Sequence, residues 1–155
     1  METAALEGAY RRFIAVAREG GFRPPADRSA WPAEHVVAHV LANDRLLSAT
    51  TAELLAGGAP SYDNTPATLE PYLAEIGRAA GDWDGLVATA RQCGLELVML
   101  ARRLDDAAVD RPVQVRILDG GTVRVEGMVP WSGVLATQAE VRLPARTEEL
   151  EQLRA

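Results

Sequence analysis

Two histidines, His35 and His39, stand four residues apart in the segment 34–40. Residues at this spacing lie on the same face of a helix, and two imidazoles on one face can share a divalent metal ion that takes a third protein ligand. At about 100° per residue, His39 falls at the edge of the apolar arc and points toward the interior, whereas His35 lies further out. The pair is therefore a candidate metal site; the alternative is that each imidazole only forms a hydrogen bond with a neighbour.

A third ligand has to be another residue type, because the chain has no other histidine. Helices that could face the pair offer amide and carboxylate candidates at Gln138, Glu140, Glu148 and Glu149. The only cysteine, Cys93, lies in the middle of an apolar helical stripe. That position indicates core packing, because a reactive thiol needs an electropositive and partly exposed setting.

Apolar residues at helical spacing predict the helices that must carry these side chains. The predicted helices are residues 6–17, ended by Gly20-Gly21; about Pro32 to Leu55, closed by Gly57-Gly58; about residues 69–80; and a buried stripe from Leu86 to Leu104. Residues 59–65, rich in turn-forming types, predict a turn throughout.

Between Val113 and Val125, every second residue is apolar on both sides of Asp119-Gly120-Gly121. This pattern predicts a β-hairpin. A last helix is predicted to begin at Trp131, and Pro144 should kink it or divide it in two. Together these elements predict a mainly all-α fold, a four-helix bundle with a short β-hairpin before the last helix, in one domain over residues 1–155.

Composition narrows the partners and the compartment. The 155-residue chain carries a formal net charge of −6, and its arginines are scattered among carboxylates, so we expect no nucleic-acid partner. It has no run of roughly 18 apolar residues, so we expect no membrane span. The amphipathic start of the sequence lacks the pattern of a signal peptide, and the expected location is the cytoplasm.

Three short motifs carry a family resemblance: the run from Trp31 to His39, the YDN turn at residues 62–64, and Pro130-Trp131. In these motifs the chain resembles the DinB-like superfamily, and within it the metal-binding N-terminal domain of mycothiol-dependent maleylpyruvate isomerases. The resemblance implies a four-helix bundle, often a homodimer, that holds a divalent, zinc-like ion. It also implies one ligand from the second helix, at the place of His39, and two from the last helix.

The chain departs from the family pattern at the two last-helix positions, where Arg142 and Arg146 stand in place of histidines. Arginine stays protonated in proteins and offers no acceptor to a metal. The resemblance therefore implies an incomplete site in this chain. The two arginines can instead pair with Glu34 or Glu149, bind an anionic ligand such as a small carboxylate, or remain solvated.

Two functions remain open from the sequence. The first is a bundle with a residual site around His35, His39, Arg142 and Arg146 that binds a small molecule or a thiol. The second is a non-enzymatic bundle that acts by dimerisation or by binding a partner, with apolar faces that continue across a two-fold interface. The substrate is not specified by any motif in the chain.

Overall fold

The predicted helices form where the apolar spacing and the glycine breaks place them. The computed structural model describes residues 1–154. The helices before the hairpin are α1 (Ala4–Glu19), α2 (Ala33–Leu55), the 3-10 turn η1 (Thr65–Thr68), α3 (Glu70–Ala80), α4 (Trp83–Arg102) and the short α5 (Asp106–Val109). Gly20 and Gly57, which follow α1 and α2, both have positive φ angles, so both predicted helix ends are confirmed.

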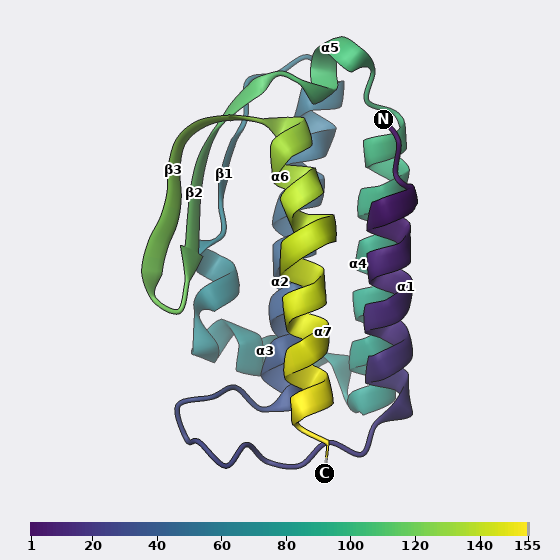
Figure 1. The fold of residues 1–155 in the computed structure, drawn as a ribbon, viewed down its shortest axis with the longest axis vertical. Helices are drawn as coiled ribbons and strands as arrows, with labels where there is room; N and C mark the ends of the chain where they lie inside the picture. Colours follow the sequence, from purple (N-terminus) through teal and green to yellow (C-terminus); the bar gives the residue numbers. More distant parts are fainter. Residues whose placement is uncertain (155) are drawn as a thin grey trace.

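The long helices α1, α2 and α4 lie side by side with the helical segment 131–152, and α2 lies behind that segment in Figure 1. Most side chains of α2 are buried. Cys93 lies in the same apolar core, as predicted, and burial raises its pKa. Within residues 1–154, no helix is both long enough and apolar enough to span a membrane.

A small mixed sheet covers one side of the bundle before the last helix. The predicted hairpin is confirmed as β2 (Pro112–Asp119) and β3 (Thr122–Pro130), joined by Gly120 and Gly121, which both have positive φ. The prediction of a turn throughout residues 59–65 is wrong, because β1 (Ser61–Asp63) pairs in parallel with β2. Its partner lies about fifty residues away in sequence, so local turn propensity cannot reveal the pairing.

The last helix is not divided at Pro144: helical turns follow one another without a break from Trp131 to Gln152, with a π-helical turn before the proline. It consists of α6 (Trp131–Thr137), a π-helical turn η2 (Gln138–Arg142) and α7 (Leu143–Gln152), with Pro144 in the first turn of α7. Proline has no N–H for the helical ladder, and π turns inside helices are frequent at functional sites. Here the π turn carries Gln138 and Arg142 toward α2.

Gly94 of α4 marks a close approach between helices, because a Cβ atom there would lie 2.8 Å from Cδ1 of Tyr10 in α1. The Tyr10 ring is held in place by its hydroxyl, which donates to Asp44. We expect Gly94→Ala to lower the free energy of unfolding by about 1–3 kcal/mol through overpacking. Gly77 of α3 has open space at its Cβ position, so the control Gly77→Ala should raise it by up to ~1 kcal/mol. Urea unfolding measures both, and a Gly94→Ala variant as stable as the wild type would contradict the packing argument.

Candidate functional site

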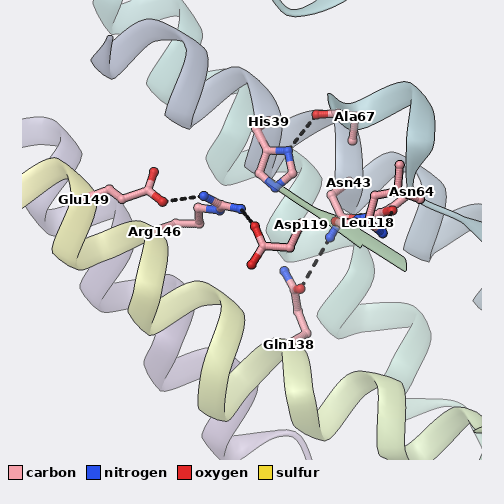
Figure 2. A network of polar contacts seen from close by, with 9 residues as sticks. All are labelled: His39, Asn43, Asn64, Ala67, Leu118, Asp119, Gln138, Arg146 and Glu149. Carbon is pink, nitrogen blue, oxygen red and sulfur yellow. Dashed lines mark hydrogen bonds and ion pairs between the residues drawn. The ribbon is translucent and has the colours of Figure 1, made fainter. Parts of the chain in front are cut away.

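His39 belongs to α2 and is buried against the segment that follows β1, with only 3% of its surface exposed. Its Nδ1 lies 2.6 Å from the carbonyl oxygen of Ala67 in η1. A carbonyl oxygen only accepts hydrogen bonds, so Nδ1 carries the proton and donates. The neutral ring then has its acceptor at Nε2, on the side away from Ala67 (Figure 2).

The charge state of His39 follows from its surroundings. Burial, and then the positive charge of Arg146, lower the pKa of His39 from its ordinary value of 6.5 to about 3. The hydrogen bond to Ala67 and the charge of Asp119 act in the opposite direction, and Arg142 adds to the lowering. His39 is therefore a neutral imidazole at physiological pH, and no hydrogen bond to its Nε2 is formed within residues 1–154.

His35 faces a different part of the molecule. It is half-buried and lines a cavity of about 420 Å³ between α2, α3 and the start of α4, beside Leu73 and Trp83. The cavities that His39 lines share no residue with it. The inward placement of His39 and the outer placement of His35 are as predicted, but the structure does not bring the two imidazoles to one cavity.

Arg142 and Arg146 do meet His39. All three line an internal cavity of about 10 Å³ between α2 and the junction of η2 with α7, together with Asn43 and Gln138. The structure therefore brings the two arginines to the same cavity as His39. A cavity of this size has room for roughly one water-sized group.

The two arginines differ in their partners. The Arg146 side chain is only 15% exposed, lies over the Trp31 ring at 5.6 Å, and forms an ion pair with Glu149. It lies 3.4 Å from the Asp119 carboxylate, which is itself 60% exposed (Figure 2). The pairing with Glu149 was one of the alternatives from the sequence. Arg142 is half-buried, and no carboxylate within residues 1–154 lies at ion-pair distance from it.

A cleft of about 600 Å³ opens beside this internal cavity. Its walls are the loop before α2, the hairpin tip and α7, and it shares His39 and Arg146 with the internal cavity. The Trp31 ring lies 5.2 Å from the His39 ring and forms one wall. Residues of the cleft that the sequence did not single out are Ser29, Thr68, Glu70, Leu118 and Gln152.

Asn64 fixes the hairpin tip over the cleft. Its side-chain Oδ1 accepts from the Leu118 backbone N–H at 2.7 Å, and its Nδ2 donates to the Leu118 carbonyl at 2.9 Å (Figure 2). The residue is fully buried. The sequence showed Asn64 only as part of a turn, because its bonding partner lies 54 residues further along the chain.

Behind His39, the same helix carries further buried polar side chains that the sequence did not identify as functional. Asn43 accepts from the Tyr62 hydroxyl through Oδ1 and donates through Nδ2 to Gln138 at 3.4 Å. Asp44 accepts from the Tyr10 hydroxyl through Oδ1. The only signal available was the polar run Asn43-Asp44-Arg45, which stands between the apolar runs 40–42 and 46–47.

The donor set beside His39 does not fit a divalent metal ion. Nε2 of His39 suits a ligand role, since its other nitrogen is fixed by a carbonyl. The groups that face it from η2 and α7, however, include two guanidiniums, which are positive and have no lone pair to offer. Two of the third-ligand candidates from the sequence already have partners, since Gln138 accepts from Asn43 and Glu149 pairs with Arg146. The other two, Glu140 and Glu148, are exposed. Residues 1–154 contain no cluster of three or more His, Cys, Asp or Glu side chains that could hold a metal.

Comparison of the chain with models of protein families, with curated proteins and with solved structures found no match.

The lowered pKa of His39 predicts a specific loss of stability in acid. Between pH 6.5 and about 3 the unfolded state binds this proton and the folded state does not. Stability is therefore full above pH 6.5 and falls by up to about 1.4 kcal/mol per pH unit as the pH decreases through this range. In His39→Gln this contribution is absent, so the stability difference between wild type and variant should shrink from pH 7 to pH 4 in urea unfolding. His35→Gln, which keeps His39, is the control and should retain the wild-type slope; a His39→Gln variant with the same slope would contradict the assignment.

For the buried carboxyl group of Asp44, we expect the opposite dependence of folding stability on pH. Burial raises its pKa well above 3.8, and its Oδ2 has no hydrogen-bond partner within residues 1–154. The contribution of Asp44 to stability is therefore complete below pH 3.8 and is lost as the pH rises toward the folded-state pKa. Asp44→Asn keeps the acceptor for Tyr10 without a titrating group. Its stability relative to wild type should rise from pH 4 to pH 8 by up to about 1.4 kcal/mol per pH unit.

The matched control for Asp44 is Asp84→Asn at the exposed start of α4. This variant should keep the wild-type pH dependence in the same urea unfolding series. A difference between Asp44→Asn and wild type that stays constant from pH 4 to pH 8 would show that Asp44 does not titrate between folded and unfolded states.

Proposed function

We propose that this protein is a DinB-like helical bundle that binds a small carboxylate-bearing molecule between α2 and α7, without the divalent ion that the resemblance implies. The bundle assignment is supported by four long helical segments that pack side by side, α1, α2, α4 and α6–α7, with the hairpin directly before the last one. It is also supported by the placement of His39 opposite Arg142 and Arg146.

The assignment of a carboxylate as the ligand rests on one observation. Arg142 is half-buried beside the neutral His39 and beside Arg146, and within residues 1–154 no carboxylate pairs with it. A partly buried charge without a counter-ion is costly. A carboxylate compensates it with charge-assisted hydrogen bonds to the planar guanidinium fork.

Asp119 is a contact of Arg146 that a ligand carboxylate can displace. Asp119 is mostly exposed and lies at 3.4 Å from Arg146, longer than a good ion-pair hydrogen bond. A ligand carboxylate can replace it on Arg146 while Glu149 stays in place. The internal cavity has room for no more than one oxygen of the carboxylate, so the rest of the ligand occupies the larger cleft against Trp31.

His39 adds a second requirement on the ligand. Its Nε2 accepts a hydrogen bond, so it selects a donor such as a hydroxyl or thiol near the carboxylate. The outer cleft wall carries Glu70 and Asp119. These charges orient the molecule with its carboxylate inward and an uncharged or cationic end outward. The ligand class is thus a hydroxy acid or a mercapto acid.

Isothermal titration of the untagged protein with lactate and mercaptoacetate, and with lactamide as the uncharged counterpart, tests this proposal. We expect the two acids to bind and lactamide not to. Arg142→Gln should weaken binding at least tenfold, about 1.4 kcal/mol. Arg91→Gln on the exposed face of α4 should leave binding unchanged.

Two results would overturn the proposal: equal binding of lactate and lactamide, or wild-type affinity in Arg142→Gln. Metal analysis of the same untagged preparation provides an independent check. One tightly held divalent ion per chain that is lost in His39→Ala would show that the site is a metal centre after all.

A further inference from the structure

A groove of about 880 Å³ runs between α1 and α4. The two helices lie side by side and run in opposite directions (Figure 1). The ion pair between Glu7 and Arg102 lies at one end of the groove, and Trp83 donates to the Ala17 carbonyl beyond the other end. Among residues 1–154, the groove shares no lining residue with either cavity of His39. Its volume is within the range of about 300–1,000 Å³ that small-molecule sites occupy.

The floor of this groove is apolar. Ile14 of α1 and Val98 of α4 contribute buried side chains, beside the ring of Tyr10. Leu95 and Met99 stand one turn apart on α4 and extend the apolar surface outward, with 47% and 61% of their surfaces exposed. Exposed apolar surface that continues into a groove with a polar rim is typical of a binding site.

Basic side chains gather at the groove, although the chain has a net charge of −6. Within residues 1–154, four arginines and two glutamates line it: Arg11, Arg18, Arg91, Arg102, Glu7 and Glu96. Arg102 pairs with Glu7, and Arg11 stands one turn from Glu7 on α1. Arg18 and Arg91 line the end nearer Trp83 and form no ion pair within residues 1–154. The groove therefore has one end where the charges are compensated and one cationic end.

We propose that the α1–α4 groove binds a medium-chain fatty acid, with its carboxylate at Arg18 and Arg91 and its alkyl chain along the apolar floor. From Glu7 to Arg18 the groove follows about three turns of α1, or about 16 Å, which is close to the extended length of dodecanoate. The guanidinium groups form charge-assisted hydrogen bonds with the carboxylate. The alkyl chain covers the exposed apolar surface of Leu95 and Met99.

Other amphiphiles fit the groove less well. A cationic amphiphile places like charges beside Arg18 and Arg91, which is unfavourable. An acidic protein helix needs cations along its whole length, whereas Glu7 already compensates one end. Glu96, about 100° further round α4 than Leu95, adds a negative charge to the outer rim. One anionic end on an apolar body is thus the ligand that the charges favour.

Isothermal titration of the untagged protein with dodecanoate, below its micellar concentration, tests the proposal. We expect one dodecanoate to bind per chain. Octanoate should bind at least tenfold more weakly, because it buries less apolar surface, and dodecyltrimethylammonium, with the same chain and the opposite charge, should not bind. The double variant R18E/R91E should weaken dodecanoate binding at least tenfold, because it places two carboxylates beside that of the ligand.

Two methionines of nearly equal exposure provide a matched pair of variants, Met99 at 61% and Met128 at 63%. Met99→Gln should weaken dodecanoate binding at least threefold, and Met128→Gln on β3 should leave it unchanged. Arg124→Glu, on β3, is the charge control, and Arg142→Gln should also leave binding unchanged because Arg142 belongs to the other site. The side chains changed in the groove and on β3 are exposed, so these variants should melt like the wild type in circular dichroism.

Several results would overturn the proposal. They are no binding of dodecanoate to the wild type, equal binding of dodecyltrimethylammonium, and wild-type affinity in R18E/R91E. Loss of binding in Arg142→Gln would place dodecanoate in the His39 cleft instead. Tighter binding of phosphatidylglycerol vesicles, or of an acidic Leu/Glu helical peptide, than of dodecanoate would show that the groove docks a membrane or a protein helix and not a free fatty acid.

Discussion

The structure depends on satisfying polar side chains that α2 buries in the core. A buried polar group without a hydrogen bond is costly, and several of those on α2 find a partner in another element, whereas Asp44 Oδ2 and Ser48 Oγ find none within residues 1–154. His39 donates to Ala67 of η1, Asn43 accepts from Tyr62 of β1, and Asp44 accepts from Tyr10 of α1. Thr51 accepts from Trp131 at the start of α6. These contacts fix the position of α2 relative to its neighbours.

The same constraint sets the chemistry of the candidate site. The Ala67 carbonyl fixes which nitrogen of His39 is protonated, and burial beside Arg146 keeps the ring neutral. Two guanidiniums opposite a neutral imidazole favour negative charge in the cavity and disfavour a cation.

The helices, the hairpin and the inward side of His39 could be predicted from the sequence, because they rest on local signals. Leu6, Tyr10 and Phe13 repeat at helical spacing, and Gly120-Gly121 supplies the positive φ angles of a tight turn. The strand β1 was missed because three residues leave no readable period and its pairing with β2 is long-range. Asn64 was read as a turn residue for the same reason.

By itself, the sequence determined which residues face inward and that the last helix carries Arg142 and Arg146. Only the tertiary structure decided that His35 and His39 line separate cavities, that Arg146 is held by Glu149, and that Arg142 has no such partner among residues 1–154. Helical spacing fixes an angle around one axis. Which neighbour fills that angle depends on how several helices and a sheet pack together, and that depends on contacts between residues far apart in the chain.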